Sequence, residues 1–329
     1  ETASLKDVHR FLWDRYRGLR TDLTVQHVQD EFSVTLYEQM VRFHIFAEHE
    51  LCEEAATVTD TEGFDSHLNI EQLQKCFASL FHLYDALFAK GRPQPNEGEF
   101  MCYFLLLTMG THGKYGFDAS QQMLQLSKLR PEILGSAPIQ FFLHVSRAFK
   151  SGNYVRFFKY AREAPYHSAC LLHAYFVPFR TRALQNIVKT LSPQGRTALG
   201  LDVVCEWFMI DTVEEAAWFL QLHGLEVGGG EADAAVTLDA KAFSHPAEAV
   251  PRSKSAAISG KRAGSFAQAC ITNTSRWPAQ ALVPPSAATG AAERQLQQFV
   301  RQYQLGHPAM AGDGAPGQVA AERIRPPGS

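Results

Sequence analysis

The chain has 329 residues, 46% hydrophobic and 20% charged, so it is long enough to bury one large or two medium cores. Its formal net charge of −3 excludes a chain-wide polyanion coat of the histone type. The longest apolar run, residues 100–109, is about half of what a membrane-spanning helix needs. Six cysteines without a Cys-x-x-Cys spacing indicate reduced, buried thiols in an intracellular protein, and the start at Glu1 favours a piece of a longer chain.

Helical periodicity runs through most of the first 200 residues. Apolar side chains repeat at helical spacing after Ser33 and again after Asn69, and both residue types cap helix N-termini. Further helices are predicted over residues 97–108, 120–128, 137–150, 154–164 and 168–190, the last with a kink near Tyr175 caused by Pro178. Short turns between helices of this length predict an all-α body, an α-solenoid of helix pairs (TPR/PCI-like) over residues 1–200.

The pattern changes after residue 200. Two short helices, 201–210 and 212–223, precede an extended stretch at 225–227, a three-glycine turn and an alternating stretch at 235–238. Helix, helix, strand, turn, strand is the order of a winged helix, so residues 201–244 are predicted to cap the solenoid with a winged helix containing two short strands.

The composition changes again near residue 245. Residues 245–329 hold nine of the 16 prolines but only four of the 37 aromatic residues, which predicts a Pro/Ala/Gly-rich, mostly disordered tail. Within this tail, residues 293–305 have the spacing of a short amphipathic helix. Both a transient helix and a helix that docks into a partner's groove fit that spacing.

Charge is distributed in blocks of opposite sign. Residues 145–200 carry nine Lys or Arg against one acid, whereas residues 201–250 carry ten acids against one lysine. These blocks indicate one surface for an anion and another for a basic partner, although ordinary solvated faces would give the same counts. The candidates for nucleic-acid binding are Arg180, Arg182, Lys189, Arg196, Lys159 and Arg162. The candidates for partner binding are Glu206, Asp211, Glu214, Glu215 and Trp218.

No motif indicates catalysis. His44 and His49 lie five residues apart on one predicted helix, which separates their side chains by about 140° and prevents a shared zinc ion. The sequence has neither a P-loop nor a Gly-x-Ser-x-Gly motif. We therefore expect a non-enzymatic protein with no cofactor and no metal.

Several ordered blocks resemble the Sac-three/GANP family, which includes the germinal-centre-associated nuclear protein and the yeast mRNA-export scaffold. The similar blocks cover residues 11–26, 42–45 with 51–54, 151–158 with 169–176, and 201–225. Within the first block the matching residues are Trp13, Asp14, Arg15, Arg20, Asp22 and Gln26.

The resemblance implies a scaffold subunit of a nuclear complex that couples transcription to mRNA export, with a nuclear location, association with nuclear pores and some cytoplasmic pool. It also implies three partners: a PCI-domain subunit, a small acidic disordered subunit of the proteasome-lid type, and RNA or DNA bound as part of the complex. Nuclear pore components would be reached through regions outside this chain, and no membrane is expected. Two alternatives remain: a sister-branch scaffold in transcription elongation, splicing or centrosome function, and a proteasome-lid or initiation-factor-like PCI subunit. The block at residues 13–26 argues against the second.

Overall fold

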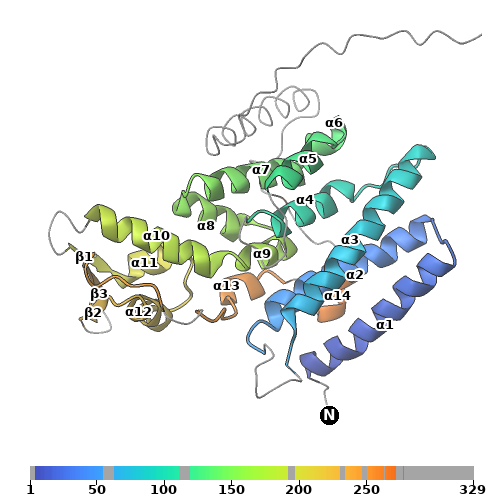
Figure 1. Ribbon diagram of the computed structural model, residues 1–329. Coiled ribbons are helices and arrows are strands. Elements are labelled where there is room, and N and C mark those ends of the chain that lie inside the picture. The colour runs from blue at the N-terminus through green and yellow to red at the C-terminus, as the bar shows by residue number, and fades with distance from the viewer. Residues whose placement is uncertain are drawn as a thin grey trace, which may run out of the picture.

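The computed structural model describes residues 4–54, 63–110, 119–191, 197–229, 234–246, 250–262, 264–271 and 277. Over these residues the chain forms fourteen helices and three short strands, which confirms the predicted, mostly helical character. No helix in these ranges is long and apolar enough to cross a membrane. Figure 1 shows the N-terminal helices at one end of the molecule and the small sheet at the other.

The first ten helices form the helical body. They are α1 (Leu5–Val25), α2 (Glu31–Glu50), α3 (Ser66–Ala89), α4 (Glu97–Leu107), α5 (Ala119–Ser127), α6 (Pro131–Leu134), α7 (Ala137–Lys150), α8 (Tyr154–Glu163), α9 (Tyr166–His173) and α10 (Phe176–Leu191). Helix α2 packs extensively against α3, and α4 packs against both α7 and α9. Every residue of α4 is buried, which explains the apolar run at 100–109 as a core helix.

Two helices begin one turn earlier than predicted. The N-cap of α2 is Asp30, whose carboxylate accepts from the Ser33 backbone N–H in a capping box. The N-cap of α3 is Asp65, and Asn69 instead lies buried inside the helix, where its side-chain oxygen is 2.7 Å from Nδ1 of His44. Aspartate carboxylates capture these free helical N–H groups, while the residues expected as caps make internal contacts.

The predicted kink near Tyr175 is a complete break in the structure. Helix α9 ends at His173 and α10 begins at Phe176, with Pro178 in the first turn of α10. The Tyr175 hydroxyl donates to the carbonyl oxygens of Leu106 and Leu107 at 2.9 and 2.7 Å. Since those carbonyls end α4, the break also closes the C-terminus of the core helix.

An α/β cap (residues 197–238) follows the helical body. It consists of β1 (Thr197–Gly200), α11 (Leu201–Phe208), α12 (Val213–Leu222), β2 (Glu226–Gly228) and β3 (Ala235–Leu238). The sheet order is β1-β3-β2, and both pairs are antiparallel, with Val236 opposite both Leu199 and Val227. The two predicted strands are present, and β1 is a third that places the start of the cap ahead of residue 201.

The chain then returns along the helical body as a C-terminal strap (residues 250–262), which includes α13 (Ala256–Ser259), and continues into α14 (Phe266–Ile271). Ile258 is fully buried, Cys270 is nearly so, and α14 packs against α2 (Figure 1). The Trp277 ring lies 5.6 Å from that of Phe141 on α7. Residues 250–262 and 264–271 are therefore ordered parts of a segment that was predicted to be mostly disordered. The amphipathic stretch at 293–305 lies outside the described residues.

Candidate nucleic-acid and partner interface

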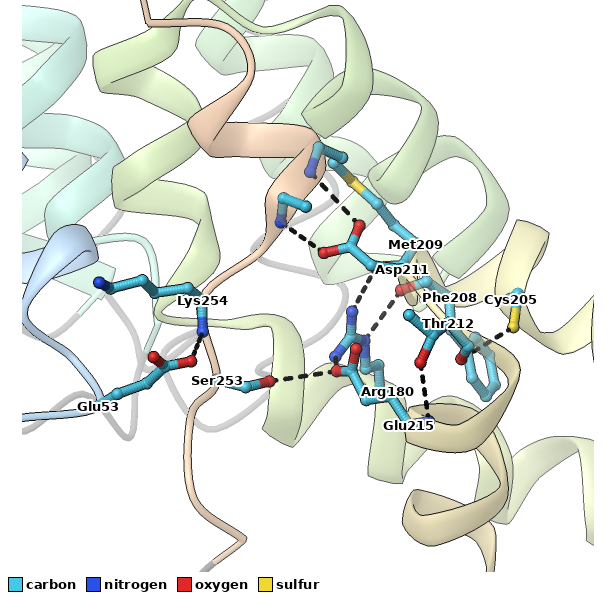
Figure 2. A network of polar contacts seen from close by, with 12 residues as sticks. Glu53, Arg180, Cys205, Phe208, Met209, Asp211, Thr212, Glu215, Ser253 and Lys254 are labelled. Carbon is cyan, nitrogen blue, oxygen red and sulfur yellow. Dashed lines mark hydrogen bonds and ion pairs between the residues drawn. The ribbon is translucent and has the colours of Figure 1, made fainter.

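Arg180 on α10 is the centre of the joint between the helical body and the cap (Figure 2). Its Nε donates to the Phe208 carbonyl oxygen at 2.9 Å, and a second guanidinium nitrogen donates to the carbonyl of Met209. A third nitrogen lies 3.5 Å from Oε1 of Glu215 on α12. Only 7% of the residue is exposed, so the prediction that Arg180 contacts nucleic acid is wrong: its donors are already occupied inside the protein.

The end of α11 explains why an arginine is buried there. Met209 adopts a left-handed backbone conformation with φ of 54°, which ends the helix and leaves its last carbonyls pointing out of the helical ladder. A guanidinium carries several donors in a fixed planar fork and suits such carbonyls, where the helix dipole also favours positive charge. Burial lowers the pKa of Arg180 to about 10, and the side chain therefore remains cationic at neutral pH.

We expect Arg180→Gln to destabilise the joint by about 2–3 kcal/mol, because two backbone carbonyls and Glu215 lose a buried charged donor. Hydrogen exchange of α11 and α12 should rise in this variant. The matched control is Arg182→Gln on the same helix, whose side chain is exposed and whose loss should leave exchange unchanged. Equal exchange in both variants would contradict the role given to Arg180.

The other basic candidates lie at the surface of α8 and α10. Lys159, Arg182 and Lys189 are exposed, as is Arg156 on the same face of α8 as Lys159. We call Arg156, Lys159, Arg182 and Lys189 the basic set. Arg162 is also exposed, but its guanidinium donates to the carbonyl of Glu206 on α11, which commits it to the joint. Arg196 lies outside the described residues.

The phenylalanine side chains between these cations are part of the hydrophobic core. Phe157 and Phe158 are fully buried and pack edge-to-face or tilted against Phe176, Phe179 and one another, with ring centroids 4.6–6.2 Å apart. They are therefore not available for stacking on bases, and any contact with nucleic acid here would be through charge.

The acidic candidates on the cap fall into two groups. Asp211 accepts from the backbone N–H groups of Ala256 and Ala257 at 2.5 and 3.4 Å, and Glu215 accepts from the Ser253 hydroxyl at 3.2 Å. These two carboxylates thus bind this chain's own strap. Glu206, Glu214 and Trp218 are exposed on the cap, and Trp218 leaves 43% of its surface open to solvent.

The strap also binds acidic residues of α2 and of the turn that follows it, which the sequence analysis did not single out. Arg252 donates to Oε1 and to the backbone carbonyl of Glu48, both at 2.8 Å, and the Lys254 N–H donates to Glu53 at 2.7 Å. Arg262 lies 3.6 Å from Glu50. The opposite charges of residues 48–54 and 252–262 could have indicated this pairing. Because the two segments are about 200 residues apart, however, the pairing leaves no local sequence pattern.

The block at residues 11–26 lies on α1 and its C-cap, and it has a packed face and an exposed face. Arg20 donates to Oε1 of Gln72 on α3 at 2.8 Å, and with Trp13 it lines a small pocket closed by His44 and Cys76. The other four residues that match the family are exposed: Asp14, Arg15, Asp22 and Gln26. The packed face holds α1 on the α2–α3 pair.

The two histidines considered as metal ligands face different partners. His44 contacts Asn69, whereas Nδ1 of His49 lies 3.1 Å from Nδ1 of His173 on α9. Within the described ranges, no group of three His, Cys, Asp or Glu residues could hold a metal ion.

Comparison with known proteins identifies the family. The sequence model of the SAC3/GANP family matches residues 1–229, which include the helical body and most of the cap, and the chain belongs to this family. It is 40% identical to SAC3 family protein B of Arabidopsis thaliana over 220 residues, 67% of this chain. It is 34% identical to Protein xmas of Drosophila melanogaster over 230 residues, 68% of this chain. It is 30% identical to SAC3 family protein 1 of Schizosaccharomyces pombe over 262 residues, 73% of this chain.

The matched region is a small part of each relative. It covers 13% of the Arabidopsis protein, 10% of the Drosophila protein and 24% of the Schizosaccharomyces protein. The relatives therefore contain long regions that have no counterpart in this chain.

Proposed function

We propose that this chain is a non-enzymatic scaffold module of a nuclear complex that couples transcription to mRNA export. The observation that carries the proposal is family membership over residues 1–229, which span the helical body and most of the cap. Burial in the core accounts for the shifted pKa values of His44, Tyr103 and His167. The proposed function therefore rests on two exposed surfaces, one on the cap and one on α8 and α10.

The cap is proposed to be a winged helix on a PCI-like helical body. The order β1, α11, α12, β2, β3 with an antiparallel sheet supports this assignment. The second helix, α12, is the one that enters a DNA groove in other winged helices, but here it carries Glu214 and Glu215 and no cation. Phosphates would repel it, so its open residues, Glu214 and Trp218, favour a protein partner such as a PCI-domain subunit.

RNA contact is proposed for the basic set on α8 and α10, within the complex. These four side chains are exposed and adjoin the cap through the contacts of α8 with α11. A small acidic disordered subunit would be attracted to the same charges. We place the module in the nucleus, with nuclear pore contacts and a cytoplasmic pool depending on parts of the protein outside this chain.

Changing Arg156, Lys159, Arg182 and Lys189 together to glutamate is expected to weaken RNA binding of the partner-bound complex by about tenfold or more, with a shallower salt dependence. Fluorescence anisotropy with a single-stranded RNA at several salt concentrations measures both. A variant with four exposed cations elsewhere changed to glutamate, Lys75, Lys90, Arg92 and Lys128, has the same net charge and is the control. An equal loss in both variants would show that the basic set is no specific site.

Affinity purification of the full-length tagged protein from its own cells tests the scaffold assignment. We expect recovery of a PCI-domain subunit and a small acidic polypeptide, together with polyadenylated RNA. Recovery of proteasome-lid or initiation-factor subunits instead would overturn it, and splicing or elongation factors without export subunits would favour the sister-branch alternative.

A further inference from the structure

Three parts of the molecule meet at one carboxylate. Oε1 of Glu215, on α12 of the cap, is 3.5 Å from the Arg180 guanidinium of the helical body and accepts the Ser253 hydroxyl of the strap at 3.2 Å (Figure 2). Beyond Ser253, the strap is tied to the cap and to the turn after α2 by the backbone N–H groups of Lys254, Ala256 and Ala257, whose acceptors are carboxylates. The strap thus braces the cap against α2.

Ser253 is placed to be modified. Its side chain is exposed, and residues 250–255 have no helical or strand structure, so the backbone there can be bound in an extended conformation by another protein. Arg252 precedes it and Lys254 follows it. Ser255, which has the same cations nearby, is only 4% exposed and is therefore protected.

We propose that Ser253 is a phosphorylation site whose modification releases the strap from the cap. The phosphoryl donor is a nucleoside triphosphate, used by a protein kinase that selects serines flanked by basic residues. The Ser253 oxygen forms a bond to the γ-phosphorus, the bond between that phosphorus and the bridging oxygen to the β-phosphorus breaks, and the hydroxyl proton is lost to the kinase's base.

The expected effect follows from charge at short range. Phosphorylation replaces a hydroxyl donor with a group of about −1.5 to −2 charge, directly beside the Glu215 carboxylate that it had bonded. Two anions at hydrogen-bond distance repel each other, and two nearby cations are already engaged, Arg180 by backbone carbonyls and Arg252 by Glu48. Residues 253–257 are therefore lifted from the cap, which uncovers Asp211 and Glu215 for a basic partner.

The test uses the full chain treated with ATP and a kinase of this specificity, with the site mapped by mass spectrometry. Phosphate is expected at Ser253 and not at Ser255, and Ser253→Ala should remove it. Hydrogen exchange of residues 252–258 should then rise at least several-fold, because the amides of Lys254, Ala256 and Ala257 lose their carboxylate acceptors.

A second variant isolates the mechanism. In Glu215→Gln the repulsion is absent, so phosphorylation at Ser253 should raise exchange of the strap much less than in the unaltered chain. Absence of phosphate at Ser253 while other serines are modified would overturn the proposal. So would a phosphorylated strap whose exchange is unchanged, or an equal rise in the Glu215→Gln variant.

Discussion

Replacing Arg42 with leucine is expected to lower the free energy of unfolding by about 3–5 kcal/mol, because it leaves two buried carboxylates without their cation. Arg42 on α2 is only 2% exposed, and its guanidinium lies 3.3 Å from Glu99 on α4 and 3.7 Å from Glu38. The same guanidinium lies over the Phe100 ring, 4.7 Å from its centre. The side chain thus joins α2 to the core helix.

The groups around Arg42 are buried, so water cannot solvate the carboxylates if the guanidinium is removed. Burial raises the pKa of Glu38, even though Asn96, Arg42 and Tyr84 each favour its charged form. Glu99 also accepts from the Tyr103 hydroxyl at 2.7 Å, and burial raises the pKa of that phenol well above its usual value. Removing the one cation in this set leaves charges that the core must neutralise by protonation or expose by opening.

The matched control is Arg92→Leu. Arg92 forms a 2.8 Å ion pair with Glu31, but both side chains are more than half exposed, so its loss should cost at most about 1 kcal/mol. Urea unfolding of both variants at neutral pH measures the difference. Similar midpoints for the two would contradict the assignment of the Arg42 cluster as a structural centre.

The second large effect is a loss of stability in mild acid. Burial lowers the pKa of His44 to about 4 and the pKa values of His49 and His167 to about 3, and burial lowers that of His173 as well. These histidines are neutral in the folded protein, whereas in the unfolded chain they take up protons below a pKa near 6.5. Stability is therefore complete above about pH 7 and falls as pH decreases toward the folded values.

Each such histidine contributes a slope of about 1.4 kcal/mol per pH unit between these limits, partly offset by Glu38 and Glu97, whose pKa values are raised by burial. We expect a net loss of several kcal/mol between pH 7 and pH 5, measured as the shift of the urea midpoint. His44→Gln should reduce the slope by about one titrating group, whereas His67→Gln, at an exposed position, should leave it unchanged. Equal slopes in all three proteins would contradict this account.

The sequence predicts the helical body well because burial sets its periodicity. The segments at 97–108, 137–150 and 154–164 agree closely with α4, α7 and α8, and Phe157 and Phe158 lie in the core. The errors at the starts of α2 and α3 arise because several polar residues near each start are competent caps. Only the packed structure selects Asp30 and Asp65.

The joint and the strap could not be predicted from the sequence, because both depend on contacts between residues that are far apart in the chain. Arg180 has the same type and neighbourhood in the chain as exposed Arg182, and only the carbonyls at the end of α11 distinguish them. The strap is poor in aromatic residues, which is typical of disorder, but its N–H groups and cations meet carboxylates from two distant elements. Strand β1 likewise depends on pairing with β3.

The most direct test of the central claim is the nuclear-to-cytoplasmic ratio of polyadenylated RNA after rapid depletion of the full-length protein from its own cells, measured by in situ hybridisation. An export scaffold predicts nuclear accumulation of this RNA, rescued by the unaltered protein but not by one carrying the four glutamate changes in the basic set. An unchanged ratio, with altered splicing or transcript elongation, would contradict the export role and favour the sister branch of the family.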